Sequence, residues 1–432
     1  MTDKKSSPNP RVPASSPSRW IRSLAKAIGP GVITGAADDD PSGIATYSVA
    51  GAQFGTGLLW TALLTWPLMA AVQIMCARIG KVTGQGLAAN FKQRFPKWLL
   101  LALVIALLVA NTINIGADLS GMADAAAMLS GVNSRWFVVV FAVLISWATV
   151  RLKYKQIADV LKWLVLVLFA YPITAFVVGA NWGQVLHDTL LPSMPRNKAE
   201  WEMLVAILGT TISPYLFFWQ TSEEVEEEKS AGQSSLAQRR GATQEELGLR
   251  NADVGVGAFF SNMVMFFIIL TTAITLNKHG IVNIETSRQA AEALRPFAGK
   301  FAATLFTLGI VGVGFLAIPT LAGSSAYAFA ETLGWRQGLN KKLDQARWFY
   351  ALILVSTAVG VALNFIGINP VKALYLTAVI NGLLAPFLLV GILIVAADKK
   401  LMQGQPSSRL GWIVVAITTV AMFAAGVAMF VV

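Results

Sequence analysis

Long apolar runs separated by short polar stretches dominate this sequence. Each run is long enough to cross about 30 Å of hydrocarbon as a helix, and none has the short alternating pattern of a β-barrel strand. The pattern predicts an all-α integral membrane protein with about eleven transmembrane helices. The expected spans are residues 27–50, 57–80, 98–125, 136–150, 157–180, 202–222, 254–277, 299–331, 348–366, 371–397 and 411–432.

Polar and helix-breaking residues interrupt the first expected span. The stretch GAADDDPSGIATYS at 35–48 places three consecutive aspartates beside Pro41, Ser42 and Gly43. A charge at the bilayer centre costs roughly 3 kcal/mol on insertion scales. Proline removes a backbone donor, serine competes for backbone hydrogen bonds and glycine tolerates unusual dihedral angles. We expect helix 1 to break about halfway across the membrane, with at least one aspartate facing a polar cavity.

The sixth span carries a second break, at Gly209, Thr210, Thr211, Ser213 and Pro214. If helices 1–5 and 6–10 are two repeats of five helices, the second must be inverted in the membrane, and the two breaks then correspond. The predicted organisation is a disordered cytoplasmic segment at 1–26 and a transporter domain at 27–432, made of a first repeat at 27–180, a second repeat at 202–397 and an extra helix at 411–432.

Paired interrupted helices are the best sequence pointer to a substrate site near the bilayer midplane. Unwound backbone exposes carbonyl oxygens, and the first half-helices end near Ala37 and Thr210, where they present negative dipole ends. With the carboxylate of Asp40, these groups predict a cation site. Consecutive helical residues point about 100° apart, so the three aspartates cannot all face one ion, and Asp38 or Asp39 can instead line the entry path.

Composition excludes several other classes of protein. Of the 432 residues, 55% are hydrophobic and 13% are charged, whereas a soluble protein carries about 25% charged residues. No phosphate-binding loop, HExxH helix or paired-cysteine motif is present, so neither a pump nor a membrane enzyme is expected, and no cofactor. The one cysteine, Cys76, lies in an apolar run and is expected to be a buried free thiol.

The net charge of +11 reflects topology and not nucleic-acid binding. Of the 34 Lys and Arg residues, 26 fall on the side of the membrane that holds the polar, Ser- and Pro-rich N-terminal segment, and 8 fall on the other side. The positive-inside rule therefore places the N-terminus in the cytoplasm, and an odd number of helices places the C-terminus outside. We expect a multi-pass protein of the cell (inner) membrane, with no nucleic acid and no obligate protein as partner.

The stretch GPGVITGAADDDPSGIATYSVAGAQFGTGLLW, the segment GADLSGMADA in helix 3 and the break in helix 6 resemble the Nramp (natural resistance-associated macrophage protein) family of divalent metal transporters. The resemblance covers roughly residues 27–430. It implies the eleven- or twelve-helix, LeuT-like inverted-repeat fold of the amino acid–polyamine–organocation superfamily, and transport by alternating access.

In helix 1 the family motif is Asp-Pro-Gly-Asn. Asp40 and Pro41 match it, whereas Ser42 and Gly43 stand in place of the glycine and the asparagine. The resemblance therefore implies that Asp40 is a metal ligand. The smaller Gly43 is expected to enlarge the cavity.

In helix 6 the family motif is Met-Pro-His. Ser213 stands at the methionine, Pro214 matches, and Tyr215 replaces the histidine. A second family histidine corresponds to Gln220, and Thr210 falls where the family uses a backbone carbonyl ligand. In lacking this sulfur ligand, the sequence resembles the Nramp-related magnesium transporters.

Helices 3 and 10 carry further family positions. Asp118 matches an aspartate that the family links to proton movement, but the glutamate three residues later is Gly121. A polar family residue of helix 10 falls on Leu384, with Asn381 one turn away. The expected metal site is Asp40, Gly43, Ala37, Thr210, Thr211 and Ser213, and the expected ion pathway comprises Asp38, Asp39, Asp118, Tyr215, Gln220 and Asn381.

An all-oxygen site suits hard cations, because thioether ligands favour softer metals. We therefore predict transport of Mg²⁺, with Mn²⁺ tolerated. Both histidines, His187 and His279, fall in expected external loops, and Tyr215 and Gln220 replace the family histidines, so we predict passage without proton coupling. A proton path made of carboxylates alone is the alternative to uncoupled passage. The alternatives are a proton-coupled Mn²⁺/Fe²⁺ transporter, an amino acid or amine carrier, and a non-transporting scaffold or sensor.

Two polar stretches admit both structural and functional interpretations. EEVEEE at 223–228 is expected to be a solvated helix end, with an acidic vestibule for cations as the alternative. Asn111, Asn114 and Asp118 recur at helical spacing in helix 3. They form either a buried polar network between helices or a wall of the ion pathway.

Overall fold

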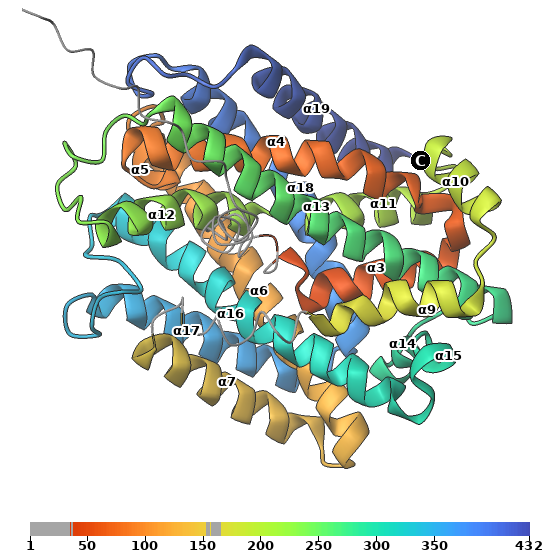
Figure 1. Ribbon diagram of the computed structural model, residues 1–432. Coiled ribbons are helices and arrows are strands. Elements are labelled where there is room, and N and C mark those ends of the chain that lie inside the picture. Colours follow the sequence, from red (N-terminus) through yellow and green to blue (C-terminus); the bar gives the residue numbers. More distant parts are fainter. Residues whose placement is uncertain (1–34, 36–37, 153–155, 157–165) are drawn as a thin grey trace, which may run out of the picture.

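The protein is a bundle of long, roughly antiparallel helices (Figure 1). This computed structural model describes residues 35, 38–152, 156 and 166–432. The expected disordered segment at 1–26, the expected ligand Ala37 and part of expected helix 5 lie outside the described residues.

Nine helices of the described part are long and apolar enough to cross a membrane. Helices 1 and 5 are described in part, by α3 (Pro41–Phe54) and by η2 (Leu166–Phe169) with α9 (Ala170–Val178). The eleven expected spans are thus all represented. The nine are α4 (Trp60–Thr83), α6 (Lys97–Ser130), α7 (Ser134–Arg151), α11 (Lys198–Thr211) with α12 (Pro214–Ser230) as one broken span, α13 (Gln244–Thr275), α16 (Ala302–Leu333), α17 (Arg347–Leu363), α18 (Pro370–Ala397) and α19 (Arg409–Val431).

Short helices and 3₁₀ turns lie at the two ends of the bundle. We call the end on the right of Figure 1 the α10 end, and the opposite end the α5 end. The sequence analysis expects the α10 end to be external and the α5 end to be cytoplasmic. The short elements are α5 (Leu87–Phe91), α10 (Trp182–Leu190), α14 (Ser287–Glu292), α15 (Arg295–Ala298), η1 (Gly55–Leu58), η3 (Asn277–His279), η4 (Gly299–Phe301) and η5 (Asn364–Ile366).

Local sequence signals set the ends of these helices. A capping box starts α13, because the Thr243 hydroxyl accepts from the Glu246 amide and the Glu246 carboxylate accepts from the Thr243 amide. Gly84 and Gly334 end α4 and α16 in the left-handed region, with φ of 64° and 76°.

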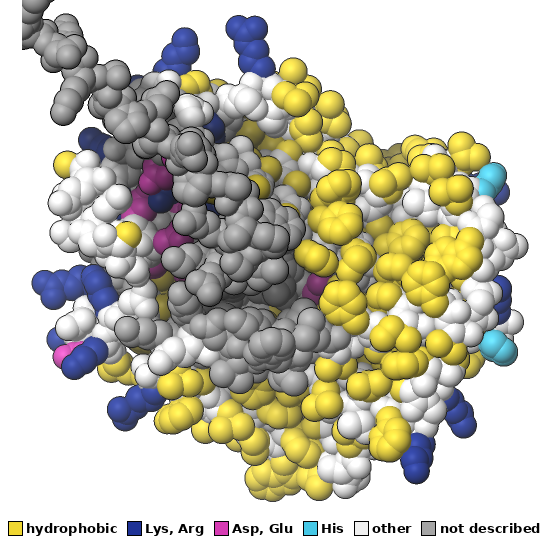
Figure 2. Space-filling view, in the orientation of Figure 1, with side chains coloured by type: hydrophobic (Ala, Val, Ile, Leu, Met, Phe, Trp, Pro, Cys, Tyr) yellow, Lys and Arg dark blue, Asp and Glu magenta, His cyan; other side chains and the backbone are white. Residues whose placement is uncertain are grey.

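Hydrophobic side chains cover much of the right-hand half and the lower part of the face seen in Figure 2, and Lys and Arg lie toward its edges. The apolar interior forms two main clusters of buried side chains. The start of α12 lies between them, because Tyr215 packs in one cluster and Phe217 in the other. The break in helix 6 is therefore held in the interior of the bundle.

The first half of helix 6 packs very closely on helix 10. A carbon atom added at Gly209 of α11 would lie 2.1 Å from the Ala378 carbonyl oxygen, and one added at Gly382 of α18 would lie 2.3 Å from the Val205 carbonyl oxygen. Small residues let membrane helices approach in this way. The contact fixes α11, and with it the helix break, against α18.

Candidate functional site

Asp40 lies at the break of helix 1 and caps α3. Its backbone is extended (φ −67°, ψ 169°), and Pro41 occupies the first helical position, where a missing N–H costs nothing. The Oδ1 atom accepts from the Gly43 amide at 2.7 Å and from the Ser42 hydroxyl at 2.9 Å. The sequence therefore uses the carboxylate of Asp40 as the N-cap of the second half-helix.

The other oxygen of Asp40 faces helix 3. The Asn114 amide of α6 donates to Oδ2 at 3.0 Å. One turn along α6, the Asp118 carboxylate is fully buried and lies within electrostatic reach of Asp40. Apart from a contact with the backbone amide of Ser42, its oxygens accept no well-formed hydrogen bond from the described residues. Helix 3 thus places one donor and one further carboxylate beside Asp40.

Two polar residues of helix 3 form hydrogen bonds to different parts of the bundle. The Asn111 amide donates to the Leu321 carbonyl at 3.1 Å and to the hydroxyls of Ser324 and Ser325 at 3.0 and 2.9 Å, so it joins α6 to α16. Asn114, by contrast, faces Asp40. Asn111 thus forms a buried polar network between helices, and a pathway role for Asn114 and Asp118 stays a prediction.

Asp38 and Asp39 face helix 7 and not helix 3. The Ser261 hydroxyl of α13 lies 2.7 Å from Asp38 Oδ2 and 3.2 Å from Asp39 Oδ1, and both carboxylates are buried. Asp38 Oδ1 has no partner among the described residues. Asp38 and Asp39 therefore share one partner on helix 7, and only Asp40 faces helix 3. Ser261 carried no sequence signal, because its partners lie more than 200 residues away.

The break in helix 6 lies at Ile212 and Ser213. Ile212 leaves the helix (φ −112°, ψ 62°), and Ser213 is extended before Pro214 starts α12. The Ser213 hydroxyl donates to the carbonyls of Thr210 at 2.7 Å and Gly209 at 3.0 Å. Ser213 thus satisfies carbonyls that the break leaves without a helical partner, and the Thr210 carbonyl keeps one lone pair for another ligand.

The two breaks meet at Gly43. A carbon atom added to Gly43 would lie 3.2 Å from Thr210 Oγ1 and 3.5 Å from Asp40 Oδ1. The buried Thr210 hydroxyl has no partner among the described residues. Gly43 therefore allows a polar group of helix 6 and the carboxylate of helix 1 to lie close together, where a larger side chain would separate them.

Thr211 takes part in a contact between the broken helices. Its hydroxyl donates to the Ile207 carbonyl at 2.7 Å and lies 3.1 Å from the Tyr47 hydroxyl of α3. Since its one proton goes to Ile207, Tyr47 is the donor of the second bond. The sequence analysis did not single out Tyr47, which looks like an ordinary aromatic residue of an apolar helix.

The expected pathway residues lie around the breaks to different degrees. Tyr215 is buried within electrostatic reach of Asp40, Asp38 and Asp118. Gln220, two turns along α12, donates to Glu224 at 2.8 Å, and its carbonyl oxygen has no partner in the described part of the chain.

Helix 10 contributes an amide and an apolar side chain. Asn381 is buried next to the contact between Gly382 and α11, and its Oδ1 atom is also unpartnered among the described residues. Leu384 is half-buried and packs against the second apolar cluster. The polar candidate on this helix is thus Asn381.

The donors at the breaks are oxygen atoms. The described residues contain no group of three or more His, Cys, Asp or Glu side chains arranged to hold a metal ion. A cation there would instead meet one carboxylate together with hydroxyl, amide and carbonyl oxygens, the donor set that hard ions accept. Asp40 is 2% exposed and Asp38 0%, so an ion reaches these groups only when the helices around them move.

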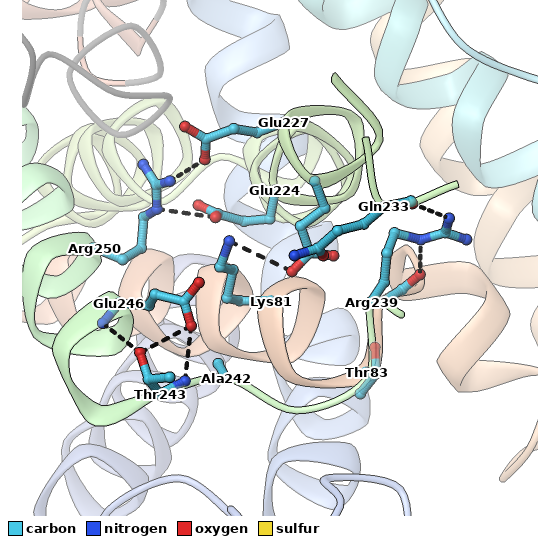
Figure 3. A network of polar contacts seen from close by, with 12 residues as sticks. Lys81, Thr83, Glu224, Glu227, Gln233, Arg239, Ala242, Thr243, Glu246 and Arg250 are labelled. Carbon is cyan, nitrogen blue, oxygen red and sulfur yellow. Dashed lines mark hydrogen bonds and ion pairs between the residues drawn. The ribbon is translucent and has the colours of Figure 1, made fainter. Parts of the chain in front are cut away.

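The acidic run 223–228 is not a solvated helix end, and that expectation is wrong. Glu224 is fully buried, and Glu226 and Glu228 are nearly so. Arg250 of α13 pairs with Glu224 at 2.9 Å and with Glu227, and Lys81 of α4 pairs with Glu228 at 3.5 Å (Figure 3). The expectation fails because of packing between distant segments: basic residues of helices 2 and 7 pack over this stretch and pair with three of its carboxylates.

The two histidines lie far from the breaks, at the α10 end, where Figure 2 shows the only His side chains on the visible face of the described part. His187 Nδ1 lies 3.0 Å from Asp188 Oδ1, and the Thr56 hydroxyl donates to Asp188 Oδ2 at 2.5 Å. The bond from Thr56 and the neighbouring His187 lower the pKa of Asp188, which keeps a negative charge at this end.

Two discontinuous helices that meet in the interior of an all-helical membrane bundle define the inverted-repeat class of membrane transport folds. Solved structures of this class match the chain. The manganese transporter of Eremococcus coleocola superposes with a TM-score of 0.76 over 97% of this chain and 90% of that one, at 18% identity. Mhp1, a nucleobase-cation-symport-1 family transporter, gives 0.57 over 93% and 90%, at 14% identity. The expected LeuT-like fold is confirmed.

The sequence itself matches a family. Residues 31–432 match Nramp, natural resistance-associated macrophage protein-like. The chain belongs to this family, so the resemblance noted in the sequence is confirmed. Two relatives named divalent metal cation transporter MntH are similar to it. The protein of Caldanaerobacter subterraneus is 27% identical over 397 residues, covering 89% of this chain and 87% of that one, and the protein of Yersinia enterocolitica is 26% identical over 416 residues, covering 93% and 94%.

Proposed function

We propose that this chain carries a hard divalent cation, Mg²⁺ with Mn²⁺ tolerated, across the membrane by alternating access. One observation carries the proposal. A buried carboxylate, Asp40, lies where the two broken helices meet, next to the unpartnered hydroxyl of Thr210. A bound cation would offset the cost of burying this carboxylate in its ionised form. The names of the curated relatives support a divalent metal as substrate.

The choice of Mg²⁺ rests on the donor atoms. Soft sulfur ligands favour the later transition metals, whereas carboxylate, carbonyl and water suit Mg²⁺ and Mn²⁺. Ser213 occupies the position at which the family resemblance implies a methionine, and its hydroxyl is bonded to backbone. We propose Asp40, Thr210 and Asn381 as protein ligands, with waters completing the shell of a partly hydrated ion, since Mg²⁺ usually keeps several waters. Thr211 and Gly43 shape the site.

We further propose that passage is not coupled to protons. Neither histidine lies near the breaks. Tyr215 and Gln220 occupy the two helix 6 positions at which the family resemblance implies histidine. A membrane potential that is negative inside would drive a doubly charged ion inward with about 4.6 kcal/mol per 100 mV, whichever way the chain is oriented.

The second candidate is a proton-coupled Mn²⁺ transporter. Relatives named divalent metal cation transporter and a fold neighbour named manganese transporter favour it. Asp118, whose carboxylate lies near Asp40 without a well-formed hydrogen bond, is the group that would carry the proton.

The test is uptake into proteoliposomes that contain the purified protein and Mg²⁺- or Mn²⁺-sensitive dyes. We expect Mg²⁺ uptake by the wild type and none by Asp40→Asn, because asparagine still caps α3 but carries no charge. Glu245→Gln removes an exposed carboxylate of α13 and is the matched control. Full uptake by a correctly inserted Asp40→Asn protein would refute the site.

A pH dye in the lumen separates the two candidates. Uncoupled transport leaves the lumenal pH unchanged while the metal enters. Acidification that scales with Mn²⁺ uptake, is absent from empty liposomes and is lost in Asp118→Asn would establish the second candidate. Good uptake of Cd²⁺ or Fe²⁺, with no effect of millimolar Mg²⁺, would contradict the assignment to hard cations.

A further inference from the structure

Helices 2, 7 and 11 border a groove on the outside of the bundle. The groove has a volume of about 770 Å³ and lies between α4, α13 and the start of α19. Its lining is mostly apolar, with Trp66 and Phe259 in edge-to-face contact at 5.3 Å and Leu410 at the start of α19. These three side chains are 38%, 44% and 73% exposed, so the groove opens on the surface that faces the hydrocarbon.

The floor of the groove is made of small residues. Ala70 and Ala71 of α4 and Gly411 of α19 line it, and a carbon atom added at Gly255 of α13 would meet nothing within 4 Å. These small residues leave open space along an apolar groove, and an acyl chain is an apolar group that can fill it.

The groove ends in polar groups at the α5 end. Arg78 lies five residues before the end of α4, Asn251 lies in the second turn of α13, and Ser407 and Ser408 precede α19. The Arg78 Nε atom donates to the Gln405 carbonyl at 3.2 Å. The buried Oγ atom of Ser407 has no partner within the described ranges. Donors thus gather where the groove reaches the membrane surface.

Arg78 is half-buried, and it forms no ion pair with a described residue. Its basic neighbours at this end differ: Arg250 pairs with three carboxylates, Lys81 with Glu228, and Arg94 with Asp398. A guanidinium has five donors, and a partly desolvated one without an anion is costly. The two terminal nitrogens of Arg78 are therefore available to an anion from outside the chain.

We propose that this groove binds one anionic phospholipid of the adjoining leaflet. The acyl chain lies along Trp66 and Phe259, and the phosphate is bound by Arg78 with the Ser407 hydroxyl. Charge complementarity favours this occupant, because basic pockets between transmembrane helices bind anionic headgroups, and a planar guanidinium matches phosphate geometry. A zwitterionic lipid would bring its own cation against Arg78, and a detergent would leave Arg78 without an anion.

The experiment uses the full chain, purified and delipidated in a neutral detergent. Native mass spectrometry counts bound dioleoylphosphatidylglycerol or dioleoylphosphatidylcholine, and thermal unfolding measures stabilisation by each. The wild type should bind one phosphatidylglycerol in preference to phosphatidylcholine. Arg78→Gln should weaken phosphatidylglycerol binding about fivefold, the factor that one basic residue contributes. Lys399→Gln, an equal charge change at an exposed position of the same end, should have no effect.

A second pair of variants tests the groove and leaves Arg78 in place. Gly255→Trp should fill the groove and abolish retention of both lipids. Gly248→Trp adds the same bulk to the same helix outside the groove, where added atoms also meet nothing within 4 Å, and should bind lipid as the wild type does. Unchanged phosphatidylglycerol binding by Arg78→Gln or by Gly255→Trp would overturn the proposal. Equal binding of the two lipids by the wild type, or equal weakening in Lys399→Gln, would overturn it too.

Discussion

The side-chain amide of Asn114 donates a 3.0 Å hydrogen bond to the Oδ2 atom of Asp40, 74 residues earlier in the chain. This bond orients the carboxylate oxygen that does not cap α3. A bond of this kind, made to a proposed metal ligand, fixes the direction in which the ligand's remaining lone pairs point.

Replacing Asn114 by Ala should therefore weaken binding of the transported ion. Loss of a partner that orients a metal ligand costs about 10- to 100-fold in metal affinity, so KM for Mg²⁺ uptake should rise by about that factor. Among the described residues the Thr112 hydroxyl bonds within its own helix, to the Leu108 carbonyl at 2.7 Å, and Thr112→Ala is the control. An unchanged KM in Asn114→Ala would show that the bond does not orient a ligand.

Ser213 offers a test of metal choice. Ser213→Met should place a thioether at the helix 6 break and admit softer metals, because sulfur ligands select them. Cd²⁺ uptake in proteoliposomes should rise well above that of the wild type while Mg²⁺ uptake falls. Ser213→Leu has similar bulk without sulfur and should not gain Cd²⁺ uptake. If both variants gain it equally, cavity shape and not the donor atom sets selectivity.

The contact between Gly209 and helix 10 should not tolerate a methyl group. In Gly209→Ala the added carbon would lie 2.1 Å from a backbone oxygen, and backbone cannot move as a side chain can. We expect a loss of about 1–3 kcal/mol, measured as a lower unfolding temperature in detergent. Gly248→Ala, where the added carbon meets nothing, should unfold at or above the wild-type temperature. Equal unfolding temperatures of the two variants would contradict the packing.

Arg250 should be needed only while its acidic partners are charged. Removing one member of a buried ion pair costs about 3–5 kcal/mol, because the other charge is left uncompensated. Arg250→Gln should therefore lower the unfolding temperature strongly, since Glu224 is fully buried.

The double variant Arg250→Gln with Glu224→Gln should recover much of that stability. The exposed pair Arg295–Glu292, at 3.0 Å, gives the comparison: Arg295→Gln should have little effect, because surface pairs contribute about 0–1 kcal/mol. A double variant no more stable than Arg250→Gln alone would mean that Arg250 acts through other contacts.

The helix breaks could be predicted because their causes are local. Proline lacks a backbone donor and is favoured at the first position of a helix, so Pro41 and Pro214 mark the starts of α3 and α12 in both sequence and structure. The long apolar spans were equally predictable, because hydrocarbon thickness sets their length.

The partners of the polar groups could not be predicted, because they are set by packing between distant segments. Ser261 faces Asp38 across 223 residues, and Tyr47 faces Thr211 across 164. The prediction of a solvated helix end at 223–228 was wrong for the same reason, because nothing near Glu224 in the sequence indicates that Arg250 pairs with it. A single sequence reports which residues are polar, but not which of them meet.

The bond between Tyr47 and Thr211 has a mechanical consequence. It joins α3 to α11, the two half-helices that extend from the breaks toward the α10 end, and the Gly209 contact fixes α11 to α18. We therefore expect these three pieces to move together when the protein changes conformation. The non-helical peptides at Asp40 and Ser213 are the points at which the broken helices can bend, so a small rotation there would displace α3 and α11 from the site.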